Sequence, residues 1–71
     1  MHKAIVVGVK RARLDADMTI MALAVKSQAS NKTIDRIEND RPVKLSTARR
    51  VAKALRLPDD AVVVVKPGSA G

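Results

Sequence analysis

The chain has 71 residues, which makes one domain near the lower end of what a single hydrophobic core can stabilise. It contains no Phe, Trp or Tyr, so the core must be built from Leu, Ile, Val, Met and Ala. It carries 14 Lys and Arg against 7 Asp and Glu, a formal net charge of +7. The lack of cysteine excludes disulfides and thiolate metal sites, and the single histidine, His2, cannot assemble a zinc site with scattered carboxylates.

The positive charge is concentrated in the middle of the chain. Residues 30–56 have a net charge of +5, against +3 for residues 1–29 and −1 for residues 57–71. A folded basic surface indicates a polyanionic partner, which binds with release of counterions from its phosphates. The longest apolar runs are far shorter than the ~20 residues that cross a bilayer, and the N-terminal run is too short for a signal peptide. We therefore expect a cytoplasmic protein with no membrane partner.

The residue pattern does not decide where the first predicted helix begins. One helical face, at spacings of three and four, holds Val6, Val9, Arg13 and Ala16. The β-branched run Ile5-Val6-Val7 can instead open the chain as a strand.

A second helix is predicted from Thr19. This residue is a suitable N-cap for a helix through Ile20, Leu23, Ala24 and Ser27, in a segment without Gly or Pro. Gln28-Ala29 is then the expected turn.

Ser30 can cap a third helix, in which Ile34 and Ile37 face inward. The outward residues of this helix are Asn31, Lys32, Asp35 and Arg36. We expect the helix to end near Asn39-Asp40, because Asn and Asp tolerate the left-handed conformation and Pro42 blocks continuation.

A fourth helix is predicted from Leu45 to Leu55, with one apolar stripe formed by Ala48, Val51, Ala52 and Leu55. Pro58 and Asp59-Asp60 can start a last short turn before the four valines 62–65, which favour strand over helix. The fold class is therefore mainly α: a compact bundle of four to five helices with a possible C-terminal β-strand at 61–65. We assign residues 1–66 to the domain and 67–71, rich in Gly, Pro and Ser, to a disordered tail.

An ordered series of motifs runs through most of the chain. It consists of Arg13, then Met18-Thr19, then Leu23-Ala24, then Ser-Asn-Lys-Thr-Ile-Asp-Arg-Ile-Glu at 30–38, then Asn39-Asp40-Arg41-Pro42, and lastly Val51 to Leu55. In this order and spacing the series resembles the Cro and repressor helix-turn-helix family, from about Val9 to Val62. Three positions depart from the family pattern. Gln28 replaces the turn glycine, Asp40 replaces the glycine that ends the recognition helix, and Ile20 replaces a DNA-contacting glutamine.

The resemblance implies a fold like that of λ repressor and sequence-specific binding of double-stranded DNA, with a recognition helix at about 30–39 in the major groove. Asn31 can pair with adenine, and Lys32 or Arg36 with guanine. Thr33 can touch a thymine methyl or a phosphate. The residues expected at phosphates are Thr19, Ser30, Arg41 and Lys44, of which the first two are helix caps and the last two lie in the loop after the recognition helix. Ile20 either reads a thymine methyl or packs at the edge of the core.

The resemblance also implies an internal ion pair between Arg13 and Glu38, which would fix the recognition helix against the scaffold. The family commonly binds two-fold symmetric operators as dimers, with half-sites ~34 Å apart. The residues expected to mediate dimerisation are Val62, Val63, Val64 and Val65, either as paired strands or as an apolar helix end. The alternative is that they pack within the monomer against the first helix.

The predicted function is transcriptional regulation, without cofactor, metal or small-molecule substrate, by a homodimer bound to an operator. No nucleophile, base or phosphate-binding glycine loop supports an enzyme. Two alternatives stay open: an antitoxin-type module that acts through a protein partner, and an architectural or excision-directing DNA-binding protein.

Overall fold

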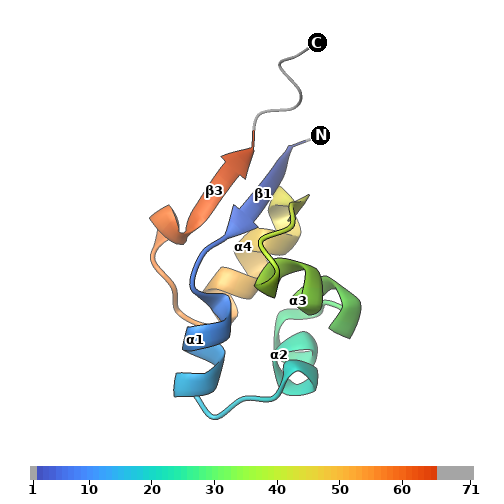
Figure 1. Ribbon diagram of the computed structural model, residues 1–71, viewed down its shortest axis with the longest axis vertical. Helices are drawn as coiled ribbons and strands as arrows, with labels where there is room; N and C mark the ends of the chain where they lie inside the picture. Colours follow the sequence, from blue (N-terminus) through green and yellow to red (C-terminus); the bar gives the residue numbers. More distant parts are fainter. Residues whose placement is uncertain (1, 66–71) are drawn as a thin grey trace.

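The structure, a computed structural model, describes residues 2–65 as helices grouped beside a small antiparallel sheet (Figure 1). In chain order the elements are β1 (Lys3–Val6), α1 (Val9–Asp15), α2 (Ile20–Ser27), α3 (Asn31–Glu38), β2 (Val43–Lys44), α4 (Leu45–Ala54), the 3-10 helix η1 (Asp59–Ala61) and β3 (Val62–Val65). The predicted mainly helical fold, with its four helices and C-terminal strand, is confirmed. The tail expected at 67–71 lies outside the described residues.

The N-terminal segment is a strand, so the helical placement of Val6 is wrong. β1 ends at Val6, and Gly8, with a φ of 80°, turns the chain into α1. Val6 is nevertheless buried, as the last residue of the central strand, where it lies opposite Val62. Ala16 lies just beyond α1 and is exposed, since the helix ends at Asp15. The β-branched residues Ile5 and Val6 favour this outcome because they pair with Val63 and Val62, far along the chain.

The sheet has the strand order β2-β1-β3. β3 pairs antiparallel with β1, from Val6 opposite Val62 to Lys3 opposite Val65. The four valines therefore pair with β1 within the monomer. The two-residue strand β2 pairs with the other edge of β1, with Lys44 opposite Lys3. β2 has no counterpart among the predicted elements.

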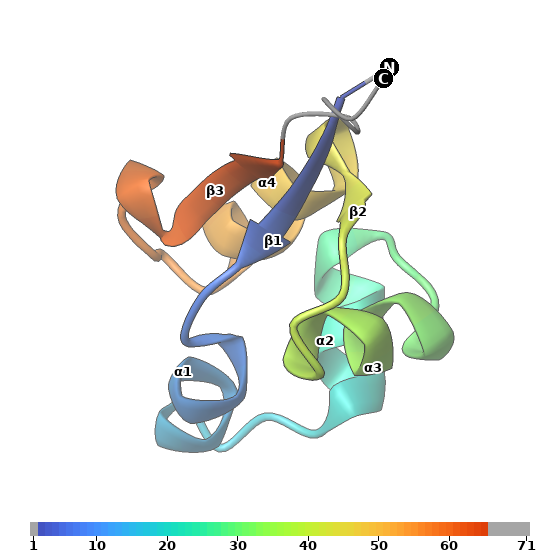
Figure 2. The ribbon, with the colours of Figure 1, turned by 45° about the horizontal axis from the view of Figure 1, so that its top comes forward.

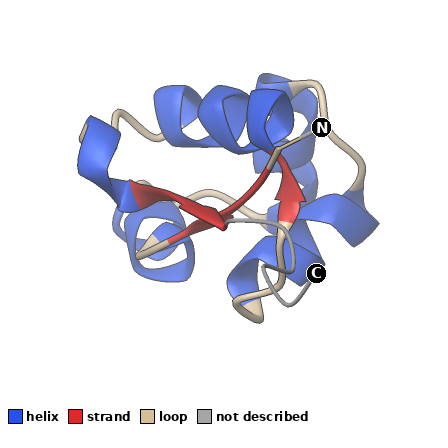
Figure 3. Cartoon of the chain, turned by 90° about the horizontal axis from the view of Figure 1, so that it is seen from above, coloured by secondary structure: helices blue, strands red, loops and turns tan. Residues whose placement is uncertain are grey.

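The helices share one core with the sheet. Figure 2 shows α4 behind the sheet and α1, α2 and α3 below it, and Figure 3 shows the strands running through the middle of the molecule. The largest fully buried side chains are Leu23, Ile34, Ile37, Val6, Val9 and Val51. They come from the sheet and from all four helices, so the packing of α3 is fixed from several sides. In residues 2–65, no helix has the length and apolar character that a membrane span needs.

Candidate nucleic-acid interface

The segment from Thr19 to Glu38 forms two eight-residue helices joined by a tight turn. The hydroxyl of Thr19 accepts a hydrogen bond from the Ala22 N–H at 3.0 Å and caps α2. The hydroxyl of Ser30 accepts from the Thr33 N–H at 3.1 Å and caps α3, as the sequence predicted. Each cap satisfies an N–H group that its helix leaves free, so the start of α3 is defined to the residue.

Gln28 ends α2 in the left-handed conformation, with a φ of 57°. A residue with a Cβ is strained there, since the left-handed region costs roughly 1–2 kcal/mol for most side chains. Gln28, which stands where the family usually has glycine, therefore keeps the same turn at the cost of backbone strain.

We expect Gln28→Gly to raise the free energy of unfolding by about 0.5–1 kcal/mol. Glycine relieves the left-handed strain, and its greater freedom in the unfolded chain offsets part of that gain. Urea denaturation of the two proteins measures the difference. Lys26→Gly, within α2, is the matched control and should destabilise by about 1 kcal/mol, because its backbone is helical. A destabilising Gln28→Gly would show that the side chain, and not the backbone, holds the turn.

Arg50 of α4 supports this turn from behind. Its Nε donates to the Ser27 carbonyl at 3.1 Å, and Nη2 donates to the Gln28 carbonyl at 3.4 Å. These carbonyls end α2 and have no partner within it, so a cation placed there satisfies them and interacts favourably with the helix dipole. The positioning role of Arg50 is visible only once α4 is placed behind the turn.

α3 has a buried face and an exposed face. Ile34 and Ile37 are at most 1% exposed, and they fix the helix against the core. The opposite side presents to solvent Asn31, Lys32, Asp35 and Arg36. Thr33 lies between the two faces and accepts a hydrogen bond from the Ser30 hydroxyl at 2.9 Å. The helix therefore carries a row of hydrogen-bond donors on a side that no other part of residues 2–65 covers.

Arg13 of α1 and Glu38 of α3 form a nearly buried ion pair, with side chains 10% and 8% exposed. Arg13 Nε donates to Glu38 Oε2 at 2.6 Å, and Nη2 donates to Oε1 at 3.3 Å. Nη1 donates to the Met18 carbonyl at 2.9 Å, which ties the start of α2 to the same guanidinium. The hydrogen bond to Glu38 raises the pKa of Arg13 above its ordinary value, against the effect of burial. One side chain thus links α1, α2 and the end of α3.

The remaining residues of the sequence-predicted site lie around α3. Arg41 is exposed and directly follows the left-handed Asp40, whose φ of 58° ends α3. The predicted placement of Lys44 in a loop is wrong, although the residue is exposed. It belongs to β2 and pairs with Lys3, because the buried Val43 draws this segment onto β1. Ile20 is half-buried and packs against the core.

A family model described as helix-turn-helix matches residues 9–62 of this chain. The chain belongs to the Cro/repressor-type helix-turn-helix family. The match covers α1 to α4 together with the capped turn and both faces of α3. Searches among curated proteins and among solved structures found no match.

Membership of this helix-turn-helix family makes the protein a DNA-binding transcription regulator. The family is not typically enzymatic. Two of the residues that differ from the family pattern, Gln28 and Asp40, take the left-handed backbone conformation that glycine adopts easily. Ile20 takes the first position of α2 as a half-buried core contact.

Proposed function

We propose that the protein is a Cro- or repressor-like regulator that reads a specific operator with the exposed face of α3. In this arrangement Asn31, Lys32 and Arg36 reach base edges in the major groove, and Thr33 contacts a thymine methyl or a phosphate. The observation that supports this most directly is the sharp division of α3. Its apolar residues are buried, while its donors are exposed. Ser30 caps the start of this helix, and the Arg13–Glu38 ion pair holds its end.

The charge of α3 suits a negatively charged partner. Lys32 and Arg36 are exposed cations and Asp35 is an exposed anion, whereas the Glu38 carboxylate is paired with Arg13. The ion pair neutralises the acidic charge at the end of α3. The residual positive charge attracts the DNA backbone without specifying a sequence.

Phosphate contacts are proposed at the starts of α2 and α3 and at two cations that follow α3. Thr19 and Ser30 stand at helix N-termini, where free N–H groups attract anions. Their hydroxyls already serve as caps, so the neighbouring backbone N–H groups are the donors that remain. Arg41, exposed after α3, and Lys44, exposed on β2, add cationic contacts along the backbone.

We further propose that the protein acts as a homodimer through Val62–Val65. Val63 and Val64 are 48% and 47% exposed although they are β-branched residues of a strand. Such apolar exposure at the edge of a sheet favours association with another chain. A dimer would present two copies of α3 to the halves of a two-fold symmetric operator. Because DNA is the partner, we place the protein in the cytoplasm at the nucleoid.

Base-reading and phosphate-binding residues should respond differently to substitution. Asn31→Ala and Arg36→Ala should each relax preference at particular base pairs by about 1–3 kcal/mol. Arg41→Ala and Lys44→Ala should weaken binding to all sequences about equally and make the salt dependence of affinity shallower. Selection from random oligonucleotides, followed by binding titrations on the selected and on a scrambled site at several salt concentrations, measures both effects.

Equal losses on specific and random DNA for all four substitutions would remove the assignment of α3 as the recognition helix. An antitoxin-type module would instead show tight capture of one protein partner with weak operator preference. An excision-directing or architectural protein would bend its site and contact a recombinase without controlling a promoter.

A further inference from the structure

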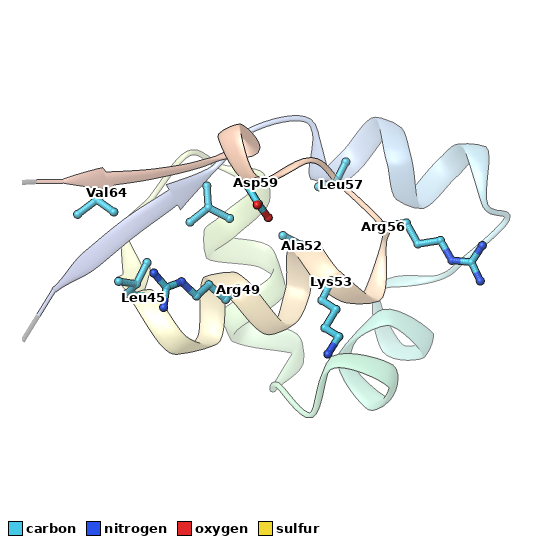
Figure 4. Close-up of a pocket in the computed structure, with 9 residues that line it drawn as sticks. Leu45, Arg49, Ala52, Lys53, Arg56, Leu57, Asp59 and Val64 are labelled. Carbon is cyan, nitrogen blue, oxygen red and sulfur yellow. The ribbon is translucent and has the colours of Figure 1, made fainter.

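A groove of about 770 Å³ lies between α4 and β3. Its walls are the outer side of α4 and the sheet face that carries Val62 and Val64 (Figure 4). Its charged residues are Arg49, Lys53, Arg56 and Asp59, and none of its lining residues belongs to α2 or α3. The groove is therefore separate from the DNA-reading face, and it borders the strand that we propose for dimerisation.

β3 is an edge strand of the described sheet, since β1 alone pairs with it. The Val7 N–H donates to the Ala61 carbonyl at 2.8 Å, which makes Val7 and Ala61 a hydrogen-bonded pair. Hydrogen-bonded and non-hydrogen-bonded pairs alternate along an antiparallel ladder. Val63 and Val65 therefore direct both backbone groups toward β1, as the Ala61 carbonyl does, whereas the Ala61 N–H donates to the Pro58 carbonyl at the start of η1. Val62 and Val64 direct theirs toward the open edge.

This alternation restricts how a second copy can add to β3. A symmetric antiparallel pair must match an outward-directed residue of one copy with an outward-directed residue of the other. The register that uses both Val62 and Val64 places Val62 opposite Val64 of the partner subunit. The two-fold axis then passes through Val63, which meets Val63 of the partner subunit as a non-hydrogen-bonded pair. An axis between Val63 and Val64 is excluded, because it would match inward-directed groups with outward-directed ones.

Arg49 and Asp59 lie at different positions along the groove, and the other two basic residues, Lys53 and Arg56, lie toward the end of α4. Lys44 and Val65 flank Lys3 on the two sides of β1, so α4 starts at the Val65 end of the sheet. Arg49 lies one turn into α4 and near Val64, whereas Asp59 lies where the chain enters β3, as Figure 4 shows. Both side chains are exposed, and within residues 2–65 neither forms an ion pair.

We propose that a second copy of this chain adds to β3 about an axis through Val63, and that Asp59 of each copy pairs with Arg49 of the other at the mouth of the groove. The antiparallel arrangement brings the entry end of one β3 to the exit end of its partner, so opposite charges meet twice. Val62 and Val64 of both copies then share one apolar surface over the groove. This assignment rests on the dimer proposed above and adds its register and its charge specificity.

Cysteine cross-linking tests the register, because the chain has no cysteine of its own. Directly opposite residues of a non-hydrogen-bonded pair have Cα atoms about 4.5 Å apart, within the range that a disulfide spans. Val63→Cys should form a covalent dimer readily under mild oxidation. Val62→Cys and Val64→Cys should form it at least about tenfold more slowly. In this register each of these residues is offset by two positions from the same residue of the partner subunit. Fast cross-linking at 62 or 64 with none at 63 would overturn the register.

Charge reversal tests the ion pair. Arg49→Glu and Asp59→Arg should each raise the dimer dissociation constant about tenfold or more, since each places two like-charge pairs in the interface. The double variant should return it to within a few-fold of the original protein. Sedimentation equilibrium measures the constants, and circular dichroism checks that each variant is folded. Arg11→Glu with Asp15→Arg, an exposed pair on α1, is the matched control and should leave the constant unchanged.

The outcomes separate this assignment from the proposed function. A chain that is monomeric at all concentrations, or single reversals that leave dimerisation unchanged, would overturn the assignment even with sequence-specific DNA binding intact. Failure of the double variant to restore the dimer would overturn the Arg49–Asp59 pairing. A dimer that cross-links at Val63 but has no sequence preference for DNA would support the interface and refute the operator-binding function.

Discussion

Replacing Arg13 by alanine should lower the free energy of unfolding by about 3 kcal/mol. The substitution leaves the Glu38 carboxylate charged, 8% exposed and without its guanidinium partner, and uncompensated buried charges are among the costliest defects in a protein. It also removes the donor to the Met18 carbonyl, so the segment between α1 and α2 loses its link to α3. Urea denaturation, with the slope checked for a two-state transition, measures the loss.

The pair is expected to matter for placement more than for net stability. Glu38→Gln in the Arg13→Met background should recover much of the loss, because neither side chain is then charged and the methionine retains the packing of the arginine stem. Arg11→Ala, an exposed position on the same helix, should change stability by less than about 0.5 kcal/mol. Additive losses in the Arg13 and Glu38 cycle would mean that the two side chains do not interact.

The same variants examine what the pair does for recognition. Glu38 ends α3, and the guanidinium holds it relative to α1 and to the start of α2. If this link sets the angle of α3, the Arg13→Met, Glu38→Gln protein should fold yet discriminate less between operator and random DNA. An unchanged ratio of the two affinities would assign the pair to stability alone.

The part of the fold that depends on local signals could be predicted from the sequence. Thr19 and Ser30 mark the starts of α2 and α3, and the spacing of Ile34 and Ile37 fixes which side of α3 is buried. The positions of these residues follow from helix periodicity and capping chemistry, which act within a few residues. The exposed donors of α3 therefore follow from the sequence alone.

The elements that depend on distant partners were the ones that the sequence left open or missed. β1 becomes a strand only because the valines at 62–65 return to pair with it, and β2 exists only because Val43 adds to the other edge. A two-residue strand has no periodicity to detect. The same distance hides Arg50, whose contacts lie 22 and 23 residues away in the chain. Pairing across the chain, and not local preference, decided these positions.

Leu23→Ala should be the most damaging single truncation of the core, with an expected loss of about 3–4 kcal/mol. Leu23 is fully buried, and the other five largest buried side chains are β-branched residues held in few rotamers. Such neighbours cannot swing into the space that a missing isobutyl group leaves, so most of the cavity should persist. A 71-residue domain without aromatic residues has little stability in reserve, and a large unfolded fraction is expected near 37 °C.

A control substitution on the same helix and the binding of operator DNA both test the expected loss of stability in Leu23→Ala. Val25→Ala changes a side chain that is 76% exposed on the same helix, and it should be neutral or slightly stabilising because alanine favours helix. Operator DNA at 100 times its dissociation constant should restore about 2.7 kcal/mol to Leu23→Ala, because only the folded chain binds it. Thermal melts with and without DNA measure both effects. Equal losses at 23 and 25 would mean that helix α2 is not packed on the core as described, and its turn could then not orient α3 on DNA.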